Sequence, residues 1–143
     1  MPAPADLPSV DPSDLARALA ASWDGRTAYR GVVQPGNPAL GQCYPTARVV
    51  QCFYPEYEIA SGEVWTGSAV EHHFWNVRGR GADAERLDLS WQQFPPDSVV
   101  RRFVVLDRTA LGDSGATVER CALLLRRVLL HLRRASPRSG HAD

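Results

Sequence analysis

The sequence predicts a single α+β domain in which a helix headed by a cysteine packs on an antiparallel sheet and a C-terminal helix completes the core. Three segments space their apolar residues as helices do, and short runs of aromatic and β-branched residues lie between the second and third. The chain has 143 residues, 44% of them hydrophobic, which suffices for one core but not for two. We expect the domain over residues 11–134, with flexible tails at 1–10 and 135–143.

The first predicted helix follows a Pro-rich start. Asp11 or Ser9 can cap it, Pro12 suits its first position, and Gly25 ends it. Its apolar face carries residues four apart: Leu15, Leu19 and Trp23.

The second predicted helix begins at Cys43, after a Gly- and Pro-rich loop over residues 31–41, and ends at Pro55. Its apolar stripe is Ala47, Val50 and Tyr54. The third predicted helix, over 118–132, keeps helical spacing of apolar residues on one face and should pack against the rest of the core.

Four runs of aromatic and β-branched residues predict strands of one sheet. They are residues 57–65, 72–78, 86–90 and 99–106. The second and third are joined by Gly79, Arg80 and Gly81, which is a hairpin signal.

The charge composition excludes several function classes. The 16 basic and 16 acidic residues cancel, so no overall field attracts nucleic acid or an anionic membrane, and neither is expected as a partner. All the basic residues are Arg, which excludes pyridoxal enzymes and P-loop NTPases because both need a lysine. No cofactor is predicted.

The first 12 residues lack the pattern of a secretory signal, and the most apolar stretch, 121–132, is split by Arg126 and Arg127. Three cysteines without a secretory context are interpreted as free thiols. We therefore expect a cytoplasmic protein.

Cys43 is the candidate nucleophile. A helix N-terminus stabilises a thiolate, so its position predicts a lowered pKa. Cys52 and Cys121 fall inside helices, where a thiol packs as a small hydrophobe.

A catalytic thiolate needs a histidine base held by a carboxylate or an amide. If Arg78 pairs with Asp83 across the hairpin, the antiparallel register places His73 opposite Asp88. The carboxylate could then orient the imidazole. A register shift of one residue would substitute His72, which otherwise faces solvent or has a structural role.

An oxyanion hole would complete this site. The Cys43 N–H is one natural donor, and Asn37 and Gln42 are side-chain candidates between which spacing does not choose. A zinc site from Cys43, His72, His73 and Asp88 is the less favoured alternative, because neighbouring strand residues diverge. Glu63 is a charge with no assigned chemistry.

Several segments resemble the YunG-like family of small bacterial proteins. They are the run from Asn37 to Cys43 continuing to Gln51, His73–Asn76, Asp88–Ser90 with Gln93–Pro95, and the closing helix from Thr117 to Leu132. The resemblance covers residues 13–132. Its Cys, His, Asp order and its Cys-headed helix followed by a sheet are similar to papain-like thiol enzymes, which implies Cys43 as nucleophile, His73 as base and Asp88 as orienting group.

The expected function is therefore that of a thiol hydrolase or acyl-transfer enzyme acting on an amide, thioester or ester in a small molecule or peptide. The alternative is a non-catalytic binding or scaffold domain with the same fold, because a fold does not by itself imply a function.

Overall fold

The computed structural model describes residues 6–31, 34 and 36–135. The helices are α1 (Pro12–Ser22), α2 (Cys43–Phe53) and α3 (Gly115–Ala135). The strands are β1 (Glu58–Trp65), β2 (Val70–Arg78), β3 (Glu85–Leu87) and β4 (Val99–Val105). The predicted α+β class and the Cys-headed helix are confirmed.

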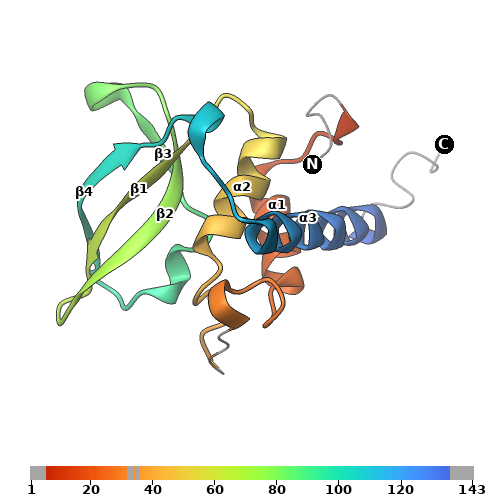
Figure 1. Ribbon diagram of the computed structural model, residues 1–143, viewed down its shortest axis with the longest axis horizontal. Coiled ribbons are helices and arrows are strands. Elements are labelled where there is room, and N and C mark those ends of the chain that lie inside the picture. The colour runs from red at the N-terminus through yellow and green to blue at the C-terminus, as the bar shows by residue number, and fades with distance from the viewer. Residues whose placement is uncertain (1–5, 32–33, 35, 136–143) are drawn as a thin grey trace.

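The molecule has a sheet on one side and helices on the other, with α2 between the sheet and the pair α1 and α3 (Figure 1). The sheet is antiparallel with the order β3-β2-β1-β4. Helix α2 is thus the element that joins the two layers, and its first residue is Cys43.

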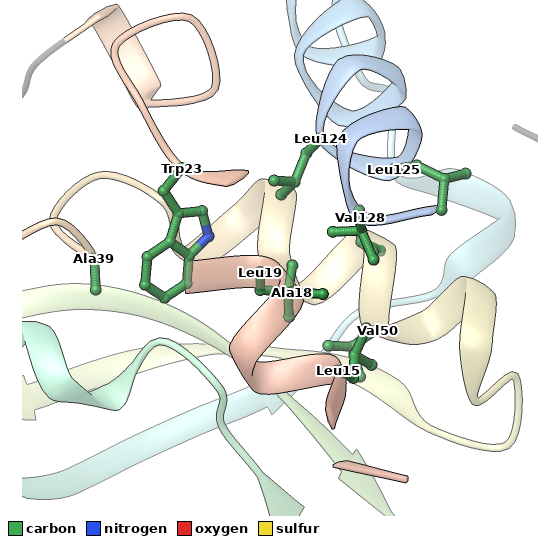
Figure 2. Close-up of a cluster of buried hydrophobic side chains, with 10 residues drawn as sticks. Leu15, Ala18, Leu19, Trp23, Ala39, Val50, Leu124, Leu125 and Val128 are labelled. Atoms are coloured by element: carbon green, nitrogen blue, oxygen red, sulfur yellow. The ribbon is translucent and has the colours of Figure 1, made fainter. Parts of the chain in front are cut away.

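The main core lies among the three helices. Figure 2 shows Leu15 and Leu19 of α1 together with Leu124 and Val128 of α3, all fully buried. Burying side chains of this size contributes roughly 1.5–3 kcal/mol each, so this cluster is the main source of stability on the helical side. Val50 of α2 completes the contact.

Helix α1 begins where one of the two predicted caps lies. The Asp11 side chain accepts a hydrogen bond from the Asp14 N–H (2.8 Å), and Pro12 occupies the first helical position. The helix ends at Ser22, before the predicted stop at Gly25.

The predicted tails fall partly outside the described residues, which omit 1–5 and 136–143. The rest of the predicted N-terminal tail packs on the core through Leu7 and Val10. The Val10 carbonyl also accepts a hydrogen bond from the Tyr54 hydroxyl (2.6 Å). This segment is therefore joined to the C-terminal end of α2.

Strand β2 presents its two faces to different surroundings. Asn76 faces α2 and donates to the Ala47 carbonyl (3.0 Å), whereas Trp75 and Val77 form a second buried cluster with Ala60 on the opposite face. Since side chains alternate along a strand, His73 shares the face of Trp75 and His72 does not. The ladder with β1 agrees, because it places His73 opposite Gly62 and Trp75 opposite Ala60.

The β2–β3 hairpin differs from the predicted register by two residues. Arg78 pairs with Glu85 and not with Asp83, because a 3₁₀ turn at Gly81–Asp83 lengthens the loop. The predicted strand over 86–90 is correspondingly short and ends at Leu87. Asp88 therefore lies just beyond the ladder.

Within the described ranges, no helix is both long and apolar enough to cross a membrane.

Candidate active site

Helix α2 begins at Cys43 because the preceding loop turns sharply into it. Gly41 adopts φ +80°, a conformation that glycine tolerates best, and its carbonyl accepts a hydrogen bond from the Tyr29 N–H (2.8 Å). Gln42 is the N-cap residue but makes no side-chain cap. Pro45 lies in the first turn, where its missing N–H costs no helical hydrogen bond. The sequence thus leaves the first N–H groups of the helix free beside the cysteine.

Cys43 is half-buried, and its surroundings shift the pKa of its thiol in both directions. Burial raises its pKa most, and the charge of Asp88 raises it further, while the N–H groups of Phe74, Tyr44 and Cys43 itself lower it. Burial outweighs the N–H groups, and the pKa of Cys43 is about 11. The expectation of a lowered pKa at this helix start is therefore wrong for the resting protein, and deprotonating the thiol near neutral pH requires a base.

His73 lies on β2 with its side chain fully buried (0% exposed). Its Nε2 is 2.7 Å from Asp88 Oδ2. A carboxylate can only accept a hydrogen bond, so Nε2 carries a hydrogen, and in the neutral ring Nδ1 then carries a lone pair. Among the described residues, Nδ1 has no hydrogen-bond partner although it is buried, so the structure does not bring the Cys43 thiol into hydrogen-bond contact with His73. The ring therefore presents an unused acceptor inside the protein.

Three aromatic rings enclose His73. Trp75 stacks on it at a centroid distance of 5.6 Å, and Phe94 and Trp91 meet it edge-on at 4.7 and 6.0 Å. Trp91 belongs to the 3₁₀ turn η4 (Trp91–Gln93), which follows Asp88 closely. The sequence interpretation did not anticipate that Trp75 and Trp91 would both contact the histidine ring.

Asp88 receives hydrogen bonds on both carboxylate oxygens. Besides His73, Oδ2 lies 3.4 Å from Arg86 Nη2, while Oδ1 accepts from the Ser90 N–H (3.2 Å) and hydroxyl (3.4 Å). Its side chain is only 6% exposed. The sequence interpretation missed Arg86, although its position two residues before Asp88 on a predicted strand indicated a shared face.

The His73–Asp88 contact exists although the register that predicted it was wrong. A shift of two residues leaves every side chain on its original face, whereas a shift of one would have reversed them. His72 accordingly lies on the other face, is exposed, and makes a 2.7 Å hydrogen bond with the Ser61 hydroxyl. The alternatives that use His72 as the base or as a zinc ligand have no support in this geometry. In the described part of the chain, no group of three or more His, Cys, Asp or Glu side chains is placed to hold a metal.

The two oxyanion candidates have different surroundings. Gln42 is buried, and its Nε2 donates to the Asp24 carbonyl (3.0 Å). Asn37 is half-buried, and its Nδ2 donates to the Gln93 carbonyl (3.0 Å) in η4. Asn37 therefore lies against η4, the turn that also covers His73. The side-chain amides of Asn37 and Gln42 each retain a second N–H.

The residue after Cys43 anchors the helix to the segment before α3. The Tyr44 hydroxyl donates to Asp113 Oδ1 (2.5 Å), and Arg48 Nε donates to Asp113 Oδ2 (2.9 Å). The Tyr44 ring also meets Phe74 edge-on at 4.8 Å. These contacts fix the first turns of α2 against β2, and no pattern in the sequence interpretation indicated them.

A family model described as YunG protein matches residues 11–133. The chain belongs to the YunG protein family. The match runs from the cap of α1 into the last turn of α3, so the YunG region contains Cys43, His73 and Asp88. No curated protein and no solved structure matches the chain. The family resemblance predicted from the sequence is thus confirmed.

Glu63, the other charged residue that the sequence analysis singled out, makes an ion pair across the sheet. Arg102 Nε and Nη2 each lie 3.0 Å from one of its carboxylate oxygens. This contact lowers the pKa of Glu63. The pair joins β1 to β4.

The raised pKa of Cys43 predicts a steep pH dependence of its alkylation. Since the thiolate is the reactive form, the rate with iodoacetamide should rise about tenfold per pH unit from pH 7 to 10. Mass spectrometry of the alkylated peptide measures this rate residue by residue. A plateau below pH 8 would instead show a resting thiolate and contradict this expectation. Cys121, with a pKa raised to about 12 by burial, is the internal reference and should react more slowly.

Proposed function

We propose that this YunG protein is a papain-like thiol hydrolase or acyl-transfer enzyme that acts on an amide, thioester or ester carbonyl of a small molecule or peptide. Cys43 is the nucleophile, His73 is the general base and Asp88 orients His73. The observation that carries the proposal is the state of the His73 ring: its Nε2 is bonded to Asp88 while its buried Nδ1 has no partner. A base with a free lone pair in a water-poor site is what thiol activation requires.

The reaction proceeds in two stages. The Cys43 proton passes to His73 Nδ1 as sulfur attacks the carbonyl carbon, and the carbonyl electrons move to oxygen. When the tetrahedral intermediate collapses, the bond to the leaving group breaks and His73 returns the proton to that group. Water, or another acceptor in a transfer reaction, then attacks the thioester carbonyl and gives its proton to His73. The C–S bond breaks, the acyl product leaves, and His73 returns the proton to the Cys43 sulfur.

The raised pKa of the resting Cys43 thiol fits proton transfer during the attack better than a permanent ion pair between a Cys43 thiolate and a His73 imidazolium. A protonated thiol is inert until a substrate carbonyl arrives, and the transfer to His73 then coincides with attack. The Asp88 carboxylate supports this step because it stabilises the imidazolium that forms. It also holds the ring so that Nδ1, and not Nε2, receives the proton.

The anionic oxygen of the intermediate needs donors close to Cys43. The backbone N–H of Cys43 supplies one, as part of the unpaired first turn of α2. Asn37 is the better side-chain candidate because Gln42 is buried. The arrangement of a Cys-headed helix on an antiparallel sheet supports the comparison with papain-like enzymes.

The second candidate function is a non-catalytic binding or scaffold domain. One observation favours it: burial raises the pKa of Cys43 to about 11, as it would for a packing thiol. An acyl donor distinguishes the two candidate functions, because only the enzyme would form an acyl adduct on Cys43.

Incubation with an aryl thioester and an activated aryl ester should leave one acyl group on Cys43, detected by intact-mass and peptide mass spectrometry. Cys43→Ala should abolish the adduct. Cys52→Ala is the matched control, since Cys52 lies on the same helix and is half-buried like Cys43. If neither donor acylates Cys43, or if both variants retain the adduct equally, the scaffold function replaces the enzyme.

A further inference from the structure

Arg86 occupies a defined place beside the candidate site. It is the central residue of β3, and its guanidinium lies 4.2 Å from the centroid of the Trp91 ring and 5.7 Å from that of Trp75. Both distances are within the range of cation–π attraction. Two of the three rings that enclose His73 thus also hold Arg86.

The guanidinium and the imidazole share one oxygen. Asp88 Oδ2 lies 2.7 Å from His73 Nε2 and 3.4 Å from Arg86 Nη2, and Ser90 occupies Oδ1. A carboxylate held by donors on both oxygens cannot rotate without losing one of them. Its orientation toward His73 is consequently set in part by Arg86.

A second arginine of the same hairpin shows what is particular to Arg86. Arg78 has the same side-chain exposure (42%), lies over the Tyr57 ring at 5.0 Å and contacts the carboxylate of Glu85. Glu85 is 57% exposed and contacts no residue of the site, whereas Asp88 is 6% exposed and contacts the base. The two arginines thus share their exposure and a contact with an aromatic ring, but Arg78 binds the exposed carboxylates of Glu85 and Glu56, whereas Arg86 binds the buried carboxylate of Asp88.

We propose that Arg86 is a positioning residue of the Cys43 site: seated on Trp91, it holds the Asp88 carboxylate against His73 and offsets its negative charge beside Cys43. This inference rests on the proposed function for its catalytic meaning.

The charge effect reaches Cys43 through Asp88. The groups around the thiol are the Asp88 carboxylate with Arg86 behind it, the Phe74 N–H from β2, and the Cys43 and Tyr44 N–H groups from α2. Removing the Arg86 charge leaves the Asp88 carboxylate less compensated, which disfavours the Cys43 thiolate.

The test compares Arg86→Gln, Arg86→Lys and Arg78→Gln by the pH profile of Cys43 alkylation with iodoacetamide. Arg86→Gln should shift the profile upward by about half a pH unit, so that Cys43 reacts about threefold more slowly at each pH. Arg86→Lys keeps the charge and should recover most of the rate. Arg78→Gln should match the wild type.

The proposal fails if Arg86→Gln leaves the profile where Arg78→Gln leaves it, or if Arg86→Lys is shifted as far as Arg86→Gln. Thermal unfolding of all three variants identifies a purely structural effect, which would change stability without moving the profile. Alkylation needs no substrate. It therefore tests Arg86 even if Cys43 is never acylated, an outcome that would overturn the proposed function alone.

Discussion

Replacing His73 with glutamine is expected to slow the acylation of Cys43 by an aryl thioester by about 100-fold or more, the usual contribution of a general base. Glutamine approaches the size of histidine and can still donate to Asp88, but its amide does not accept a proton near neutral pH. The thiol, with a pKa of about 11, then has no neighbour that can take its proton. The rate of adduct formation on Cys43, followed by intact-mass spectrometry, measures the effect.

His72→Gln is the matched control. His72 is adjacent in sequence, lies exposed on the opposite face of β2 and is hydrogen-bonded to the Ser61 hydroxyl. Its replacement should leave the acylation rate within about twofold of the wild type, since surface substitutions away from a site change little. Equal loss in both variants, or acylation of His73→Gln at the wild-type rate, would exclude His73 as the base.

Periodicity in the sequence predicted the fold well because burial patterns are local. The four-residue spacing in α1 and the β-branched and aromatic residues of β1 each reflect the burial of one element against one core. The hairpin register was not predictable in this way. Whether residues 79–83 form a tight turn or a longer loop with a 3₁₀ turn depends on their backbone conformations, and the two glycines, Gly79 and Gly81, are compatible with either.

The sequence predicted the contact between His73 and Asp88 but not the electrostatics of Cys43. Position at a helix start indicated a low pKa for Cys43, yet burial outweighs the helix N–H groups. Burial of a thiol depends on contacts from β2 and the Asp88 segment, which are far away in the sequence. Arg86 and the rings of Trp91 and Phe94 were missed for the same reason: their relation to His73 exists only after the chain turns beyond β3.

The ring stack that supports His73 depends on a position without a side chain. Gly62 pairs with His73 on one side and with Phe103 on the other. A Cβ there would lie 2.3 Å from the Arg102 carbonyl oxygen, 2.6 Å from Phe103 Cβ and 2.7 Å from Trp75 Cη2. The Arg102 oxygen belongs to the β4 backbone and Phe103 Cβ is attached to it, so β4 would have to move. The Trp75 ring is buried and contacts the Phe103 ring.

Gly62→Ala is therefore expected to lower the free energy of unfolding by about 2–3 kcal/mol, at the upper end of the usual cost of overpacking. The control is Gly115→Ala at the start of α3, where a Cβ would meet nothing within 4 Å. That change should be neutral or stabilise by roughly 0.4–1 kcal/mol, because alanine restricts the unfolded chain. Urea denaturation of both variants measures the difference, and failure of Gly62→Ala to fold where Gly115→Ala folds is the same result in a stronger form.

Because Trp75 stacks on His73, a folded Gly62→Ala protein should also acylate Cys43 more slowly. A variant as stable as the wild type would contradict this expectation and mean that β4 and the Trp75 ring can move away from Gly62 without cost.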